Sequence, residues 1–250
     1  MERDGETNEL EEINSSTNLN NSSMNKTNTS LNLSNMIETI NRQLYSFKLI
    51  LLGDVSVGKT SILNRYINNT FVENCQCSVG VEFKVTSLIL DSTTQVSLKI
   101  WDTSGQEKFR ALTRNYYNDS QGVVLVYDVT SKSTFQNLKR WLNDLEEFGS
   151  PESQIIIVAN KADVSETKRQ VSKAEGEAFA EKQKLLFIEV SAKEGTNILI
   201  LFEKITKKLV EQHKEKEKMK STKGTFLHKN QHSIDSAGFA KKNKDTINCC

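Results

Sequence analysis

The chain has 250 residues, of which 36% are hydrophobic and 26% are charged, an ordinary composition for a soluble globular protein. The formal net charge of +1 hides an uneven distribution, since residues 1–45 carry seven acidic and three basic side chains while residues 214–250 carry nine lysines and four acids. The middle of the chain is neutral, which argues against a nucleic-acid-binding core.

Neither a membrane span nor a disulfide framework is expected. No apolar run approaches the ~20 residues needed to cross a bilayer, and the first thirty residues lack the apolar core of a secretory signal. The four cysteines form two close pairs, Cys75/Cys77 and Cys249/Cys250, with no distant partners and no matching histidines for a zinc site. We expect reduced thiols in a cytoplasmic protein, unless a modification anchors the chain to a membrane.

The first 45 residues are rich in Asn, Ser and Thr and contain few large apolar groups. Such a segment cannot bury enough surface to offset the entropy lost on ordering. We therefore predict a disordered extension over residues 1–45, followed by a folded domain over residues 46–213.

Within this domain, short apolar runs alternate with stretches in which apolar residues recur every three or four positions. The apolar runs predict six strands, at 47–53, 81–90, 96–102, 122–129, 155–160 and 185–190. The helical spacing predicts four helices, at 59–69, 133–148, 172–183 and 197–212. Five of the strands are continuous runs typical of a mostly parallel sheet, whereas the short polar turn in LILDSTTQVSL predicts one antiparallel edge strand. The pattern predicts an α/β fold with helices on both faces of a six-stranded sheet.

The stretch GDVSVGKT, Gly53 to Thr60, matches GxxxxGK[ST] and lies between a predicted strand and a predicted helix, as this motif requires. In that geometry backbone N–H groups and the helix N-terminus surround phosphate groups, Lys59 neutralises the β and γ oxygens, and the Thr60 hydroxyl ligates Mg²⁺. A turn punctuated by glycines is the alternative. The residues predicted to bind phosphate in this loop are Val55, Ser56, Val57, Gly58, Lys59, Thr60 and Ser61.

A second loop, KIWDTSGQE, follows the strand predicted at 96–102. Asp102 at the strand end can hold Mg²⁺ through water, Gly105 offers a backbone N–H to a γ-phosphate, and Gln106 can orient an attacking water. Taken alone this stretch could equally be an ordinary polar loop, but a phosphate-binding loop upstream favours the functional interpretation.

Two further loops predict selection of the base. Asp163, in NKAD, can accept hydrogen bonds from N1 and the 2-amino group of guanine, a pair that adenine does not offer. Since a missed hydrogen bond to a charged group costs about 1.5–3 kcal/mol, this site favours GTP over ATP. In SAKEG, the N–H of Ala192 is a candidate donor to guanine O6. Either loop could also be an ordinary connection after a strand.

Together these motifs resemble those of small GTPases, specifically the Rab branch of the Ras superfamily, over residues 46 to about 213. The resemblance rests on SVGVEF, KIWDTSGQEKFR, LTRNYYNDSQGVVLVYDVT and the terminal CC. Within the Rabs the chain looks most like the branch numbered eighteen, on LTRNYY, QGVVLVYDVTSKSTF and WLNDLE. The resemblance implies a P-loop GTPase domain that hydrolyses GTP slowly, depends on an activating protein and uses Mg²⁺.

The resemblance also assigns roles to individual residues. It implies that Phe71 packs on the guanine edge and that Ser78 binds Mg²⁺ and senses the γ-phosphate. The implied guanine-binding residues beyond Phe71 are Asn160, Lys161, Asp163, Ser191, Ala192 and Lys193. An aromatic triad that presents the nucleotide state to effectors would consist of Phe83, Trp101 and Tyr116. For Phe83 and Trp101, packing in the core is the alternative.

The terminal Cys249–Cys250 pair resembles the Rab signal for double geranylgeranylation; it is not a CaaX box, and Glu2 excludes N-myristoylation. Two lipid chains give stable anchoring at ~0.8 kcal/mol per buried CH₂, and the flexible Lys-rich tail predicted over 214–250 adds attraction to anionic lipid. Two unmodified thiols are the alternative. The implied partners are an exchange factor, a Rab-type activating protein, Rab escort protein, geranylgeranyl transferase, GDP dissociation inhibitor and effectors of vesicle trafficking. The protein would cycle from the cytoplasm onto the cytosolic face of an intracellular membrane.

Several positions depart from the commonest Rab pattern. Ser78 stands where threonine is usual, Ser104 replaces an alanine, and Cys75 and Cys77 lie in the first switch. In Ras-type members a bulky residue at the position of Val55 obstructs the glutamine and an incoming arginine finger, which is worth ~10³ to 10⁵ in rate. Val55 thus leaves a second function open, a membrane module that holds GTP almost permanently. A third hypothesis for the function is an enzyme that uses an adenine nucleotide.

Overall fold

The computed structural model describes residues 42–73, 80–106 and 114–231, with side chains as far as residue 220. Several predictions fall outside these residues. They concern the Asn-rich extension up to residue 41, the switch residues Cys75, Cys77 and Ser78, and the terminal Cys249 and Cys250.

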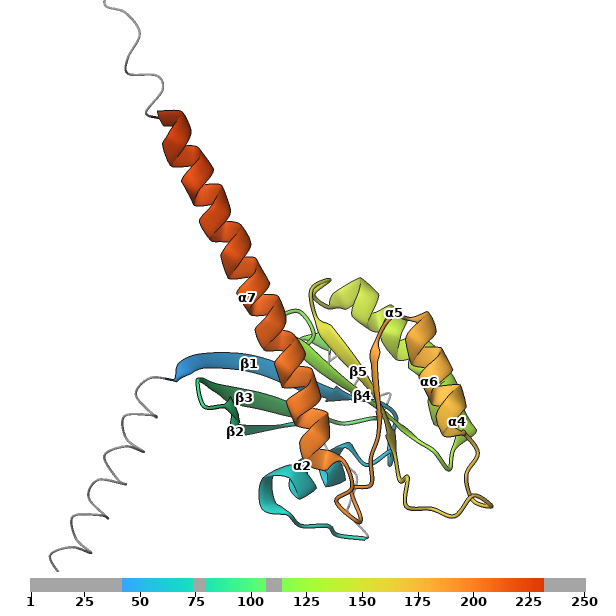
Figure 1. The fold of residues 1–250 in the computed structure, drawn as a ribbon. Coiled ribbons are helices and arrows are strands. Elements are labelled where there is room, and N and C mark those ends of the chain that lie inside the picture. The colour runs from blue at the N-terminus through green and yellow to red at the C-terminus, as the bar shows by residue number, and fades with distance from the viewer. Residues whose placement is uncertain (1–41, 74–79, 107–113, 232–250) are drawn as a thin grey trace, which may run out of the picture.

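A six-stranded sheet forms the centre of the domain, in the strand order β2–β3–β1–β4–β5–β6 (Figure 1). The strands are β1 (Gln43–Leu52), β2 (Val81–Asp91), β3 (Thr94–Thr103), β4 (Gly122–Asp128), β5 (Gln154–Asn160) and β6 (Leu186–Glu189). All neighbouring pairs are parallel except β2 and β3, which are antiparallel and place β2 at the edge. The predicted fold class is confirmed.

Helices cover both faces of the sheet (Figure 1). On one face lie α2 (Lys59–Asn68) and α7 (Ile198–Gln231), and on the other lie α4 (Lys132–Gln136), α5 (Leu138–Phe148) and α6 (Lys173–Lys182). The helix predicted over 133–148 is thus two helices, which meet at Asn137, where the backbone keeps a helical φ of −70°. None of the helices in the described ranges combines the length and the apolar character that a membrane crossing demands.

A hydrophobic core lies on each face of the sheet, and strand β1 contributes side chains to both. This is possible because successive side chains of a strand point to opposite faces. Leu49 and Leu51 pack against α2 and α7, whereas Ile50 and Leu52 pack toward α5. The neighbouring strand β4 is buried along its whole length, as expected for a central parallel strand. This double burial fixes the carboxyl ends of the central strands, from which the candidate site is built.

The first strand begins a few residues before the predicted start of the domain. Strand β1 begins at Gln43, which pairs with Thr94, so residues 43–45 of the predicted extension belong to the sheet. The ring of Tyr45 stacks on Phe47 at 6.0 Å and meets the edge of His213, in α7, at 5.4 Å. Each aromatic pair of this kind contributes about 0.5–1.5 kcal/mol. The contacts join the two ends of the domain.

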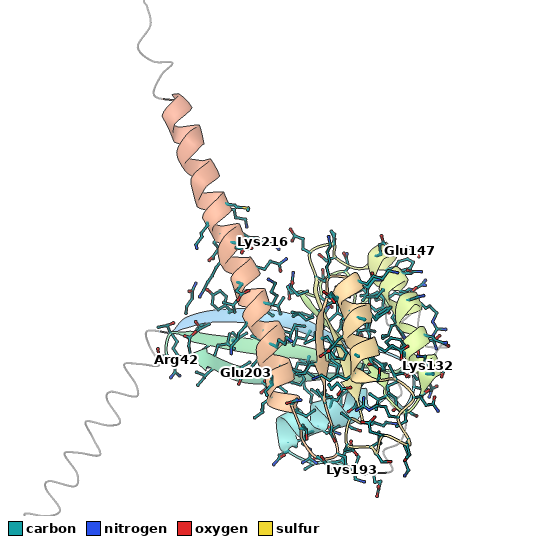
Figure 2. The ribbon with its side chains drawn as sticks, turned by 45° about the vertical axis from the view of Figure 1, so that its right-hand side comes forward. Arg42, Lys132, Glu147, Lys193, Glu203 and Lys216 are labelled. Atoms are coloured by element: carbon teal, nitrogen blue, oxygen red, sulfur yellow. The ribbon has the colours of Figure 1, made fainter. Side chains whose placement is uncertain are left out.

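Helix α7 continues to Gln231, so the prediction that it ends at residue 212 is wrong. The prediction relied on apolar periodicity, but the helix just beyond residue 212 is stabilised by polar contacts. His213 pairs with Glu217 one turn later at 3.4 Å, a spacing that supports helices. Lys216, which Figure 2 labels on the same helix as Glu203, reaches Glu152 at 2.6 Å. Beyond these contacts α7 extends away from the sheet (Figure 1).

Candidate functional site

A cavity of about 370 Å³ lies where the loops after β1, β5 and β6 meet the start of α2. Open α/β sheets bind ligands at this edge, and the volume falls within the range of small-molecule sites. Thirteen of the predicted site residues line it: Val55, Ser56, Gly58, Lys59, Thr60, Ser61, Phe71, Gly105, Asn160, Lys161, Asp163, Ala192 and Lys193. The cavity therefore brings together residues that are far apart in the chain, from Val55 to Lys193.

The loop between β1 and α2 is held in place by two glycines with positive φ. A Cβ at Gly53, where φ is +135°, would lie 2.1 Å from the carbonyl oxygen of Val126 in β4. A Cβ at Gly58, where φ is +96°, would lie 2.3 Å from the side-chain nitrogen of Asn160 at the end of β5. Both glycines are thus required by close packing as well as by backbone conformation.

Lys59 begins α2 and is 5% exposed. Its ammonium group donates to the carbonyl oxygens of Gly53 at 2.9 Å and Asp54 at 2.8 Å, so the lysine spans the loop that it follows. The first turn of α2 carries no acidic side chain, which leaves the positive end of the helix dipole directed at the cavity. This arrangement suits an anionic group such as a phosphate.

Thr60 and Asp102 bring two oxygen ligands together. The Thr60 hydroxyl donates to a carboxylate oxygen of Asp102 at 2.5 Å, and Asp102 is buried at the end of β3, opposite Leu51 of β1. Mg²⁺ prefers oxygen ligands and is usually bound by one or two side chains together with water and substrate phosphates. Because Thr60 and Asp102 together offer oxygen atoms of this kind, the pair fits Mg²⁺ at a phosphate group.

Asn160 connects the phosphate loop to the loop after β6. Its side-chain nitrogen donates to the carbonyl oxygen of Val57 at 2.8 Å, and its side-chain oxygen accepts from the N–H of Ala192 at 3.2 Å. Because Asn160 is 1% exposed, leaving either amide atom unpaired would cost about 1–3 kcal/mol. The amide thus fixes the distance between the two loops.

Asp163 and Ser191 form the other polar contact at this end of the cavity. The Ser191 hydroxyl donates to Asp163 at 2.7 Å and accepts from the N–H of Glu194 at 3.0 Å. Lys161, with a left-handed φ of 66°, pairs with Asp128 at 2.5 Å. The orientation of the Asp163 carboxylate is therefore set before any ligand binds.

Not every predicted site residue reaches the cavity. Val57 and Ser191 are buried behind its wall, where they hold Asn160 and Asp163. Gln106 is half-buried and does not line the cavity, and its N–H donates to the Ser104 hydroxyl at 3.3 Å. The role of Gln106 stays a prediction, as does that of Ser78, which lies outside the described residues.

The aromatic triad gathers on the sheet face away from α2 and α7. Phe83 and Trp101 have ring centroids 4.6 Å apart, and the Lys48 ammonium lies 4.9 Å from the Trp101 ring and 5.7 Å from the Tyr116 ring. Burial lowers the pKa of Lys48, an effect that nearby Asp119 opposes. Phe83 is 49% exposed. The alternative prediction for this residue, packing in the core, is therefore wrong.

Asp54 is a site residue that the sequence did not identify. Its carboxylate accepts from Asn137 at 2.6 Å, from the Trp141 indole N–H at 2.8 Å and from Arg140 at 3.4 Å. These donors on α5 and at its start turn the negative charge away from the cavity. Its own partners are more than 80 residues away, so no local pattern indicates the contact.

We expect the Asp54→Ala variant to lose about 1–3 kcal/mol of free energy of unfolding, because the half-buried Asn137 and the buried Trp141 lose a shared acceptor. Asp54→Asn keeps one acceptor and should lose less. Chemical denaturation measures both changes, and Asp119→Ala, at an exposed carboxylate, is the control. An Asp54→Ala variant as stable as this control would contradict the assigned role.

The chain resembles proteins of one family. Residues 48–211 match the family model described as Ras family. Ras-related protein Rab-11C of Dictyostelium discoideum is 43% identical over 161 residues, which cover 64% of this chain and 71% of the relative. Ras-related protein RABE1d of Arabidopsis thaliana is 37% identical over 206 residues, covering 82% and 93%. Ras-related protein Rab-2B of Dictyostelium discoideum is 42% identical over 164 residues, covering 66% and 80%.

Proposed function

The chain belongs to the Ras family as a Rab-type small GTPase, and from this premise we propose that it is a Mg²⁺-dependent GTP/GDP switch that recruits effectors to an intracellular membrane. The observation that supports the proposal most strongly is that the phosphate loop, Gly105 and both base-reading loops line one cavity, with Asp102 bonded to Thr60 of its wall. Each motif alone had an ordinary structural alternative. Their convergence on one cavity favours the functional interpretation of all of them.

At the phosphate end, Lys59 already faces the loop that would surround the phosphates, and it would exchange its bonds to the Gly53 and Asp54 carbonyls for phosphate oxygens. Mg²⁺, when bound, would neutralise the charge that develops between the β- and γ-phosphates. Thr60 would ligate the ion through its hydroxyl, Asp102 through water, and Ser78 from the first switch. The N–H of Gly105 would bind the γ-phosphate, so that loss of this phosphate releases both switches.

At the base end, the Asp163 carboxylate would accept hydrogen bonds from N1 and the 2-amino group of guanine. Ser191 orients the carboxylate, and Phe71 and Lys161 would pack against the base. The Ala192 N–H, which donates to the Asn160 side-chain oxygen at 3.2 Å, would be shared between that oxygen and guanine O6. Because adenine lacks the paired donors, it would leave a charged acceptor unsatisfied, and this is the basis of the selectivity for GTP.

We expect Asp163→Ala to weaken GDP binding at least 100-fold while leaving the weak binding of ADP unchanged, since two hydrogen bonds of about 1.5–3 kcal/mol each are lost. Competition of GDP and ADP against a fluorescent guanine nucleotide measures both affinities. The matched control is Asp119→Ala, which removes a carboxylate distant from the cavity. Equal competition by GDP and ADP in the wild-type protein would remove the argument for guanine.

Hydrolysis depends on Gln106 and on the neighbourhood of Val55. The Val55 side chain is 42% exposed in the cavity wall, and a Cβ at Gly105 would lie 2.4 Å from the Val55 backbone nitrogen. Val55 therefore stands beside the loop that carries Gln106, where an activating protein would insert an arginine. We propose an enzyme that cycles slowly and responds to a Rab-type activating protein.

Val55→Ser should raise activator-stimulated turnover by roughly 10- to 100-fold, a part of the 10³–10⁵ that an arginine finger supplies, and should leave GTP affinity unchanged because the loop binds phosphate through its backbone. Single-turnover hydrolysis, with and without the activating protein, gives the rate. Val72→Ser, at another exposed valine of the cavity wall, is the control. A wild-type rate that ignores the activator would favour the module that holds GTP permanently.

Membrane anchoring is the second half of the proposed function. Cys249 and Cys250 would receive geranylgeranyl groups from a transferase working with Rab escort protein, and GDP dissociation inhibitor would return the protein to the cytoplasm. An exchange factor would load GTP, and effectors of vesicle transport would bind the surface of Phe83, Trp101 and Tyr116. The finer resemblance to the branch numbered eighteen rests on LTRNYY, QGVVLVYDVTSKSTF and WLNDLE and is part of this proposal.

The double variant Cys249→Ser/Cys250→Ser should lose recovery with cellular membranes, and Cys250→Ser alone should show partial recovery, since one lipid chain binds only marginally. Fractionation of cells expressing the tagged full-length chain measures both, and bound nucleotide should be the same in all three proteins. Undiminished membrane recovery of the double variant would contradict prenyl anchoring.

A further inference from the structure

Arg65 lies in the last turn of α2 and contacts the base-reading loop from outside the cavity. Its Nε donates to the carbonyl oxygen of Ala192 at 2.9 Å, and its Nη2 donates to the carbonyl oxygen of Lys193 at 2.7 Å. The third nitrogen, Nη1, donates to the backbone and side-chain oxygens of Asn69 at 2.9 and 3.1 Å. One guanidinium thus joins the end of α2 to two successive peptide groups.

The first of these peptide groups joins two residues that line the cavity, Ala192 and Lys193. A trans peptide is planar, with its N–H directed opposite to its carbonyl, so the N–H of Lys193 points away from Arg65. Ala192 and Lys193 line the cavity, whereas Arg65 does not. Arg65 therefore fixes the direction of the Lys193 N–H and holds the chain directly after the Ala192 N–H, the donor proposed for the base.

The second peptide group connects Arg65 to the carboxylate that reads guanine. The carbonyl of Lys193 accepts from Arg65, and the N–H of the same peptide, on Glu194, donates to the Ser191 hydroxyl. That hydroxyl donates to Asp163. Three consecutive hydrogen-bonded contacts therefore lead from the guanidinium to the Asp163 carboxylate.

The same helix carries the phosphate end of the site. Lys59 and Thr60 form the first turn of α2 and Arg65 belongs to its last turn, so a single helix of ten residues spans the distance between the two ends. Asn69 caps this helix with a left-handed φ of 53°, and its contact with Nη1 fixes the guanidinium plane. Gly195, with a left-handed φ of +82°, ends the loop beside the Arg65 side chain, where even a Cβ would make an ordinary contact at 3.5 Å from Cδ.

We propose that Arg65 is a positioning residue for base selection, which holds the loop Ser191–Gly195 against α2 and so couples the base end of the nucleotide site to its phosphate end. The inference rests on the proposed binding of guanine nucleotides. It assigns to α2 a second role beside the phosphate contacts of its first turn. The two parallel donors of a guanidinium match two carbonyl groups, which a lysine ammonium cannot do with the same geometry.

The test compares dissociation of GDP, of IDP, which lacks the 2-amino group, and of ADP from the full-length protein in Mg²⁺. Arg65→Ala should release GDP 10- to 100-fold faster than the wild type and should narrow the difference between GDP and IDP. Arg65→Lys keeps the charge and one donor, so its rate of GDP release should lie between those of the wild type and Arg65→Ala. ADP, which uses neither base contact, should dissociate at the same rate from all three proteins.

Asn69→Gly is the matched control, because glycine accepts the left-handed conformation and only the side-chain contact with Arg65 is lost. If Arg65 acted only on the end of the helix, Asn69→Gly and Arg65→Ala would change stability alike and leave the ratio of GDP to IDP dissociation at the wild-type value; that result overturns the proposal. If Arg65→Ala does not fold, the ratio of GDP to IDP dissociation measured on Arg65→Lys provides the same test. A wild-type protein that does not distinguish GDP from ADP would overturn the proposed function itself.

Discussion

The buried side chain of Asn160 is the contact on which the rest of the site depends. Its amide bonds to Val57 in the phosphate loop and to Ala192 in the base-reading loop, and both bonds must form because the group is removed from water. The close approach also explains Gly58, since a side chain there would meet the Asn160 amide. One amide group therefore determines how far apart the phosphates and the base of a bound nucleotide can lie.

Other parts of the domain support this spacing from outside the cavity. The central strands, covered on both faces, fix the ends of the loops. On one side, Asn137 and Trp141 bind Asp54 and turn a negative charge away from the phosphate position. On the other, Arg65 holds the loop after β6. A carboxylate beside bound phosphates would repel them, so the contacts of Asp54 have an electrostatic as well as a structural effect.

The sequence predicted the sheet and the composition of the cavity because both follow from local patterns. Continuous apolar runs predicted the strands, and the motifs around Lys59, Asp102 and Asp163 each carry their chemistry within a few residues. Asp54 and Arg65 were missed because their partners are 87 and 127 residues away, and a charge at a surface-like position has no local signature. The length of α7 was missed because polar contacts of His213 and Lys216, rather than apolar periodicity, support the helix beyond residue 212.

The central claim is that the cavity is a guanine-nucleotide site whose two ends form one unit, and the nucleotide carried by the purified full-length protein tests it most directly. Protein prepared in Mg²⁺ is denatured, and the released nucleotide is identified and quantified by anion-exchange chromatography. The account predicts close to one equivalent of GDP or GTP per chain. Release of an adenine nucleotide, or an empty protein that binds GDP no better than ADP, would contradict it.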